Sequence, residues 1–276
     1  MTHAAILGNI AITDTEFAQF QKLIYQIAGI SLSDAKRVLL VGRLSKRLKE
    51  LAFATFTQYY KHVTSGGDKA ELQTMVDLLT TNETYFFREP KHFDLLDEVA
   101  RRQRGSGPFR VWSAASSSGE EAYTMAMVLA EALGNSAWEI VGTDISTQVL
   151  AKARLGHYPL DRIDGIPPHL LKKYCLKGIN EHEGTLLIVK ELRERVQFLH
   201  SNLMAPRKGL GQFDVIFLRN VMIYFDQETK RKVIANLLPY LKNDGYFVVG
   251  HSESLNGLSN ELKPVRPTVY RRQGAQ

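Results

Sequence analysis

The stretch over residues 110–123 constrains the fold more than any other part of the chain. It reads RVWSAASSSGEEAY, passing from an alternating strand pattern through small residues into a helix that opens with Glu120. A strand that ends in such a turn exposes backbone N–H groups and lets a ligand approach the main chain. Gly119 is the only glycine here, so the dinucleotide fingerprint GxGxxG is absent. The stretch predicts the floor of a nucleotide-type site without identifying the ligand.

Strand and helix patterns alternate after this stretch. The run FDVIFL at 213–218 is apolar on both faces, as in a buried central strand, and a helix is expected over 227–241. We expect strands at 111–114, 138–142, 213–218 and 246–250, and a last edge strand at 268–271. This order predicts an α/β fold with a doubly wound, mostly parallel sheet and a site at the carboxyl ends of its strands. An irregular segment at about 157–195 predicts a small β insertion.

The N-terminal third contains helical patterns only. Thr13 to Glu16 form a capping-box pattern, Gly29 ends the first helix, and a second begins near Ser33. Four basic residues lie beside the leucine face of that second helix: Lys36, Arg43, Lys46 and Arg47. They are either the solvated flank of an amphipathic helix or a docking ridge for an acidic helix or a phosphate backbone.

The segment TTNETYFFREP at 80–90 joins the two parts. We expect a helical docking domain over 1–90 and an α/β domain over 91–276, with the insertion inside it. One interpretation is a simple junction whose aromatic side chains fill the core. Its polar residues are then helix caps and a surface charge: Asn82, Thr84 and Arg88.

Several polar residues stand where predicted strands end. Asp144 follows the second strand, where an acid binds ribose hydroxyls in dinucleotide-type folds, although it also suits a helix N-cap. Glu120 suits a polar or cationic ligand group, or complements the helix dipole. Two further pairs lie at strand ends that line the expected cleft: Asn202 with Leu203, and Arg219 with Asn220.

Composition narrows the chemistry. Cys175 is the only cysteine, so no internal disulfide or cysteine-built zinc site is possible, and we expect a reducing cytoplasm. No signal peptide, membrane-spanning run, metal-ligand spacing, P-loop or GxSxG elbow occurs. The net charge of +6 favours an anionic partner, either nucleic acid or acidic protein. The remaining features are a candidate ribose-binding acid, a turn of small residues, and arginine and asparagine side chains without an obvious general base. They suit group transfer from a preactivated nucleotide-like donor.

Six motifs occur together in a fixed order: TTNETYFFRE, RVWSAASSSGEEAYTMAM, VGTDIS, SNL, FDVIFLRNVMIYFD and GHSESL. Together they closely resemble the CheR-type chemoreceptor glutamate methyltransferases, over about residues 12–271. The resemblance implies transfer of a methyl group from S-adenosylmethionine to receptor glutamates, leaving S-adenosylhomocysteine and using no metal. It also implies the cytoplasmic helical bundle of chemoreceptors as partner, without nucleic acid or membrane insertion.

The resemblance also assigns roles to residues. Arg88 and Tyr224 would lie nearest the transferring methyl and the incoming carboxylate, and the basic helix over 36–49 would dock on acidic receptor helices. The donor-binding residues would be Asn82, Thr84, Arg88, Ala114, Glu120, Asp144, Asn202, Leu203, Arg219 and Asn220. In some relatives the β insertion binds a receptor C-terminal peptide. Asn180 stands where such relatives tend to carry glycine, and the departures at Ala122 and Leu218 do not touch the chemistry.

Three other functions fit parts of the sequence less well. A nucleic-acid methyltransferase fits the positive charge, but the segment over 166–169 (IPPH) does not match the Asn/Asp/Ser-Pro-Pro-aromatic motif of amino-methylating enzymes. A non-catalytic donor sensor would not need Arg88 and Tyr224. An NAD-dependent oxidoreductase would carry the glycine fingerprint that is missing here.

Overall fold

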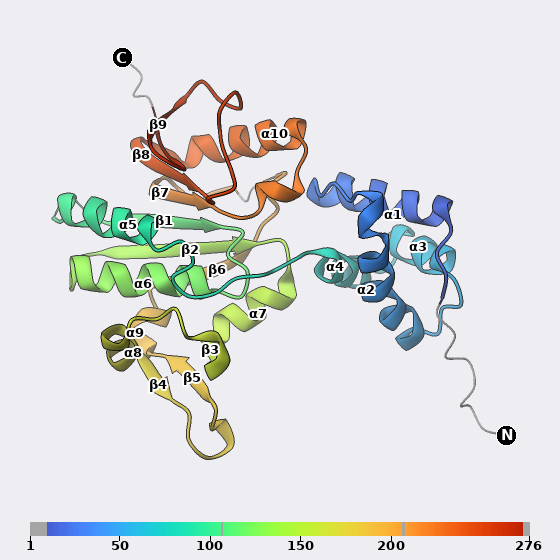
Figure 1. The fold of residues 1–276 in the computed structure, drawn as a ribbon, viewed down its shortest axis with the longest axis horizontal. Coiled ribbons are helices and arrows are strands. Elements are labelled where there is room, and N and C mark those ends of the chain that lie inside the picture. Colours follow the sequence, from blue (N-terminus) through green and yellow to red (C-terminus); the bar gives the residue numbers. More distant parts are fainter. Residues whose placement is uncertain (1–9, 106, 206–207, 273–276) are drawn as a thin grey trace. The chain divides into compact units, whose positions relative to one another are not determined.

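The computed structural model describes residues 10–105, 107–205 and 208–272. It consists of two compact units, Met1–Thr81 and Asn82–Gln276 (Figure 1). The boundary therefore lies at Thr81 rather than at residue 90, where we expected it. The reason is Phe86, which is fully buried in the core of the second unit and packs edge-on against Tyr158 at 5.0 Å between ring centroids.

The first unit is helical throughout its described residues. Helix α1 (Asp14–Ala28) starts with the predicted capping box, and Gly29 ends it in the left-handed conformation at φ 71°. A 3-10 turn, η1 (Asp34–Lys36), leads into α2 (Arg37–Glu50), and α3 (Phe56–Thr64) and α4 (Lys69–Leu79) complete the unit. The core is formed by apolar residues at helical spacing: Phe17, Phe20, Ile24, Leu40, Leu44 and Leu48.

The second unit is built on a seven-stranded sheet in the order β6-β2-β1-β7-β8-β10-β9. Strands β6 (Val196–His200), β2 (Trp138–Asp144), β1 (Phe109–Ala114), β7 (Phe213–Leu218) and β8 (Leu241–Val249) run parallel. The chain moves from β1 outward to β2 and β6, then returns to place β7 on the other side of β1. This reversal beside β1 is the switch point where doubly wound sheets bind ligands.

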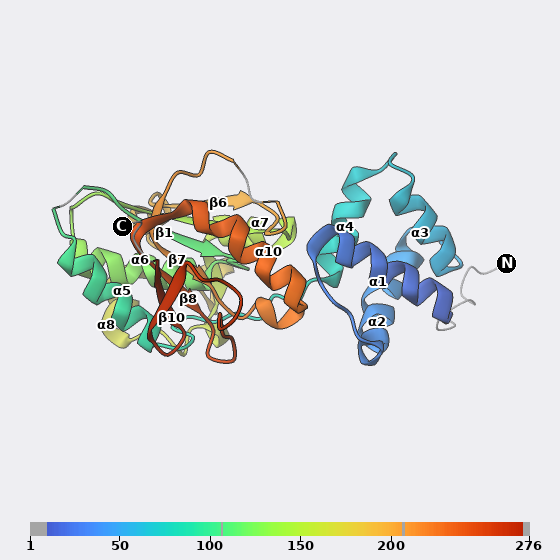
Figure 2. The same cartoon turned by 90° about the horizontal axis from the view of Figure 1, so that it is seen from above.

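Helices cover both faces of this sheet, as the seam between β1 and β7 shows. Val111 and Val215 lie in one core with apolar residues of α5 (Lys91–Arg102) and α6 (Glu120–Leu133). Trp112, one residue along, points the other way and contacts Tyr240, just after α10 (Gln227–Leu237), at 5.4 Å. The doubly wound fold is therefore confirmed (Figure 2).

Two element predictions were wrong near the C-terminus. Strand β10 (Val269–Arg272) is not an edge, because β9 (Leu262–Arg266) pairs antiparallel with it and forms the edge. Pro264 lies in β9, a position open to proline because an outer strand has one unpaired side. The helix expected to reach residue 241 ends at Leu237, since a short turn with Pro239, η5 (Leu238–Tyr240), leads directly into β8.

The predicted β insertion is present. Strands β3 (His157–Pro159), β5 (Thr185–Ile188) and β4 (Cys175–Lys177) form an antiparallel sheet in the order β3-β5-β4. It lies after α7 (Thr147–Leu155) and also carries η2 (Leu160–Arg162), α8 (Pro168–Tyr174), η3 (Asn180–His182) and α9 (Lys190–Arg193). Across the described part of the chain, each helix is too short or too polar to cross a bilayer.

Candidate active site

The turn after β1 is held in an uncommon backbone conformation. Ala115 (φ 69°) and Ser117 (φ 49°) are left-handed without being glycine, and Gly119 follows at φ 96°. Glycine is required at 119, because a Cβ there would lie 2.9 Å from the Cβ of Ala153 and 3.0 Å from the hydroxyl of Tyr158. Such strain persists only where surrounding contacts enforce it, and it concentrates at functional sites.

Asp144 lies buried at the end of β2 and is bound to this turn. The backbone N–H of Ser117 donates to one carboxylate oxygen and that of Ser146 to the other, both at 2.9 Å. The N-cap of α7 is Ser146, which takes the cap role that we had considered for Asp144. The two bonds fix the Asp144 carboxylate at the carboxyl end of the sheet, where a ribose-binding acid is expected.

Glu120 opens α6 and is buried, so it is more than a surface complement to the helix dipole. The hydroxyl of Ser118 donates to one of its oxygens at 2.7 Å, and the guanidinium of Arg162 donates to the other at 3.1 Å. Burial raises the pKa of Glu120, and the hydrogen bond from Ser118 and the charge of Arg162 act in the opposite direction.

Arg219, at the end of β7, is the centre of a buried ionic cluster. Its guanidinium donates to Glu121 and to Glu89, each at 3.0 Å, and also to the carbonyl of Arg88. Its side chain is 1% exposed and stacks over Phe93 at 5.4 Å. Both terminal nitrogens of the Arg219 guanidinium are therefore bound to neighbouring protein groups.

Arg88 is presented by a strained loop. Phe87 and Glu89, on either side of it, have φ values of 56° and 59°. The Arg88 guanidinium donates to the carbonyl of Glu83 at 3.0 Å and lies 5.5 Å from the ring of Tyr85. Its own carbonyl is held by Arg219, so the cluster fixes the backbone and leaves the half-buried side chain near the surface.

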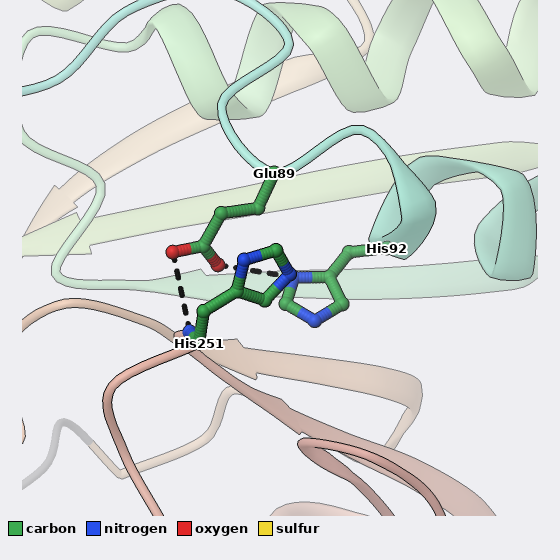
Figure 3. Close-up of side chains that lie close together, drawn as sticks. All are labelled: Glu89, His92 and His251. Atoms are coloured by element: carbon green, nitrogen blue, oxygen red, sulfur yellow. Dashed lines mark hydrogen bonds and ion pairs between the residues drawn. The ribbon is translucent and has the colours of Figure 1, made fainter.

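Glu89 lies beside His92, at the start of α5, and beside His251, in the loop after β8 (Figure 3). It accepts hydrogen bonds from the Asn220 side chain and the His251 N–H, both at 3.2 Å, and lies 3.4 Å from Nδ1 of His92. Burial raises the pKa of Glu89, but Arg219 and these donors outweigh it and hold the pKa at about 2. Burial, reinforced by Arg219, lowers the pKa of His92 to about 4.

Glu89, His92 and His251 also lie close enough together to hold a metal ion. No pattern in the sequence indicated this, because the three residues do not match a metal-ligand spacing. A cation would have to compete with Arg219, which already holds a Glu89 oxygen at 3.0 Å. The geometry therefore fits a hydrogen-bonded ionic cluster better than a metal centre.

The remaining predicted residues lie in the same unit. The carbonyls of Asn82 and Thr84 accept hydrogen bonds from Ser117 and Arg162, both at 2.9 Å, and Ala114 is buried at the end of β1. Asn202 and Leu203 follow Ser201, whose N–H donates to the Asp144 carbonyl at 3.0 Å. Tyr224 is half-buried in η4 (Met222–Tyr224), just after Asn220.

Two site residues were missed at the sequence level. Arg162 lies in the irregular insertion and carried no motif. Glu253 lies within the motif GHSESL but was not predicted as a site residue, yet its carboxylate accepts the N–H groups of Asn220, Met222 and Gly250, each at 2.7 Å. Glu253 therefore holds together the loops after β7 and β8.

The four predicted docking residues divide into two pairs. Arg43 donates to the carbonyls of Leu79 and Thr80 at the end of α4, at 3.1 and 2.8 Å. Arg47 forms a two-point contact with Glu71, at 3.0 and 2.5 Å. Both arginines thus stabilise the helical unit itself. The two lysines, Lys36 and Lys46, are exposed.

A doubly wound sheet with a buried acid at the end of its second strand is typical of proteins that bind nucleotide-like ligands. Comparison with known families makes the assignment specific. Residues 82–271 match the family model described as "CheR methyltransferase, SAM binding domain". Residues 15–80 match "CheR methyltransferase, all-alpha domain". The chain belongs to the CheR methyltransferase family.

Similar proteins span almost the whole chain. The chemotaxis protein methyltransferase of Escherichia coli K12 is 42% identical over 264 residues, which cover 95% of this chain and 92% of that protein. Chemotaxis protein methyltransferase 2 of Pseudomonas aeruginosa is 41% identical over 275 residues and covers 98% of both chains. The chemotaxis protein methyltransferase of Borreliella burgdorferi is 40% identical and covers 96% of both.

Proposed function

We propose that this methyltransferase transfers the methyl group of S-adenosylmethionine to glutamate side chains of bacterial chemoreceptors, forming γ-glutamyl methyl esters. The observation that supports this most is the placement of the strained Arg88 loop. Arg219 and Asn220 tie that loop to the end of β7, and Ser117 ties the same segment, through the carbonyl of Asn82, to the turn that holds Asp144.

The chemistry of the side chains fits the donor. S-adenosylmethionine carries ribose hydroxyls and an ammonium group, and the carboxylates of Asp144 and Glu120 would accept hydrogen bonds from them. The donor wall would be completed by Asn82, Thr84, Arg88, Ala114, Asn202, Leu203, Arg219 and Asn220. When bound, the donor supplies a methyl group on positively charged sulfur.

The acceptor requires no general base. A glutamate carboxylate is ionised at neutral pH, since its reference pKa is about 4.3. The task of the chain is to align the carboxylate for in-line displacement and to exclude water. Arg88 would orient the incoming carboxylate without pairing so tightly that its nucleophilicity is lost, and Tyr224 would border the same position.

The partner would be the cytoplasmic helical bundle of a chemoreceptor, which places the reaction in the cytoplasm. Lys36 and Lys46 offer exposed positive charge to acidic receptor helices, and Arg43 and Arg47 stiffen the helix behind them. A receptor C-terminal peptide would add a strand to the β insertion. Asn180 does not oppose this, because its φ of 53° is a left-handed conformation that asparagine tolerates.

The experiment that tests the proposal is methyl transfer from labelled S-adenosylmethionine to membranes that carry candidate receptors. We expect label in the receptor and its release as methanol at mildly alkaline pH, since carboxyl methyl esters are base-labile. Label that resists base, or that enters RNA or DNA instead of receptor, would contradict it.

A further inference from the structure

Arg162 connects the β insertion to the proposed donor site. From η2, its guanidinium donates to the carbonyl of Thr84 at 2.9 Å and to the carboxylate of Glu120 at 3.1 Å. Thr84 and Glu120 belong to the two segments that we assign to donor binding, the junction after Thr81 and the start of α6. The Arg162 side chain is 43% exposed, whereas that of Glu120 is 2% exposed.

The insertion is fixed against the same two segments at other points. The Tyr158 hydroxyl donates to the carbonyl of Ser118 at 2.8 Å, within the strained turn. Gly165 lies so close to the junction that a Cβ there would be 2.1 Å from the carbonyl oxygen of Phe86. These contacts leave the insertion little freedom to move away from the turn, so Arg162 is held where it meets Glu120.

Glu120 is a buried carboxylate that accepts hydrogen bonds from two side chains, those of Ser118 and Arg162. Its burial favours the neutral acid, and neutral Glu120 would not attract an ammonium group. Among the described residues, the charged or titratable side chains that act on it are Arg162 from η2 and Tyr158 from β3. The Tyr158 hydroxyl is uncharged at neutral pH, since burial raises its pKa further. Ser118 contributes a neutral hydrogen bond and Arg162 adds a positive charge 3.1 Å from the carboxylate, so both favour the ionised form.

We infer that Arg162 is a positioning residue for donor binding: it orients the Glu120 carboxylate and fixes the Thr84 carbonyl, so the β insertion forms part of the donor site. The inference rests on the proposed donor-binding role of Glu120. It assigns the insertion a role in every catalytic cycle, independent of any receptor peptide bound to it.

The test measures calorimetric binding of S-adenosylhomocysteine to the full-length protein between pH 6 and 8.5. We expect Arg162→Ala to weaken binding roughly tenfold, about the effect of one pKa unit on a single group, and to weaken it more toward the acid end of this range, because burial favours the neutral form of Glu120. The ratio of variant to wild-type dissociation constants is the readout, because titration of the ligand's own ammonium cancels in it. Arg162→Lys should retain most of the affinity, and Lys177→Ala, which removes an exposed cation of the same insertion, is the matched control.

A second variant separates this role from a merely structural one. In a Glu120→Gln background, the loss with Arg162→Ala should shrink to the part that comes from the Thr84 carbonyl, and the pH dependence of the ratio should vanish. An Arg162→Ala protein with wild-type affinity at every pH overturns the inference, as does a loss that is constant with pH and persists undiminished in the Glu120→Gln background. If Arg162→Ala fails to fold, Arg162→Gln takes its place and is judged by the same two results. Wild-type protein that does not bind the probe refutes the proposed function itself, which is a different result.

Discussion

Each unit of the molecule contains a buried arginine–glutamate cluster, and the two clusters serve different ends. In the helical unit, Arg47 pairs with Glu71, whose carboxylate also accepts the Tyr59 hydroxyl at 2.8 Å. In the catalytic unit, Arg219 pairs with both Glu89 and Glu121. The Arg47 side chain is 28% exposed and the Arg219 side chain 1%, so only the second arginine is removed from water.

The backbone around the two clusters explains the difference. Arg47 and Glu71 lie on regular helices, and their contact joins α2 to α4. Arg219 lies beside three non-glycine residues with positive φ: Phe87, Glu89 and Asn220. Phe87 and Glu89 each cost on the order of 1–3 kcal/mol, whereas asparagine at 220 tolerates the left-handed conformation. The first cluster joins helices, whereas the second holds strained backbone around the proposed catalytic Arg88.

The largest effect should come from Arg219→Ala. The change leaves two buried carboxylates without their cation, so we expect the free energy of unfolding of the catalytic unit to fall by about 3–5 kcal/mol. Hydrogen exchange should show lost protection at the end of β7, with the helical unit unaffected. Arg104→Ala, which removes an exposed arginine of the same unit, is the control. Unchanged protection around Arg219 would show that the strained loop does not depend on it.

Arg88→Ala should separate activity from stability. Its side chain makes one hydrogen bond, to the Glu83 carbonyl, so we expect unfolding to stay close to wild type. Methyl transfer should fall roughly 10²–10³-fold, the usual cost of removing one aligned charged donor. Initial rates of base-labile ester formation measure this, again beside Arg104→Ala. Near-normal methylation would remove Arg88 from the catalytic role.

Local signals made much of the fold predictable. Three predicted features depend only on residues that are neighbours in the sequence, and each is present in the structure: the capping box at Thr13, the left-handed Gly29 and the buried strand at 213–218. Asp144 could be placed because it stands at the carboxyl end of its strand. Strand β9 was not predicted, since its mostly exposed residues and Pro264 give it no alternating hydrophobic pattern.

The ion-pair partners of the charged side chains could not be predicted from the sequence. A helical wheel places Arg47 beside the leucine face of α2 but does not indicate Glu71, which lies 24 positions away. Arg219 and Glu89 are 130 positions apart. Family resemblance named Arg219 as a donor-site residue, yet burial and its two carboxylate partners emerge only once the chain has folded.

Acid should destabilise the catalytic unit through His92. The pKa of His92 is lowered to about 4, so between pH 6.5 and 4 the unfolded chain binds a proton that the folded chain excludes. Stability contributed by neutral His92 is complete above about pH 6.5 and should decline by up to about 3 kcal/mol on approaching pH 4. Below about pH 4.5, protonation of Glu89 in the unfolded chain should extend the decline, because its folded pKa is about 2.

Chemical unfolding across this pH range tests the His92 prediction. His92→Gln should be less stable at pH 7 and should lose less stability on acidification than wild type. His182→Gln, which alters an exposed histidine of the insertion, should behave as wild type. Equal pH slopes in all three proteins would show that His92 does not report the burial of this cluster.

Arg47→Ala should have a smaller and more local effect than Arg219→Ala. Arg47 is partly exposed, so water replaces part of its interaction, and we expect a loss of about 1–2 kcal/mol. Hydrogen exchange should place that loss in α2 and α4 and leave the strands of the catalytic unit protected. Faster hydrogen exchange in β7 of the Arg47→Ala variant would mean that the two clusters are energetically coupled. The two clusters would then not act locally, each within its own unit.

The smallest effect should come from Lys46→Ala, on the exposed side of the helix that Arg47 stabilises. Lys46 makes no ion pair among the described residues, so unfolding should be unchanged. If the exposed lysines attract an acidic receptor, kcat/KM for receptor methylation should fall a few-fold at low ionic strength, and the difference should shrink as salt screens the charges. Lys22→Ala, which removes an exposed lysine on α1, is the matched control. A fall in kcat/KM that does not depend on salt, or an equal fall with Lys22→Ala, would contradict docking through this face. The basic residues of α2 would then have only the structural role that Arg43 and Arg47 already have.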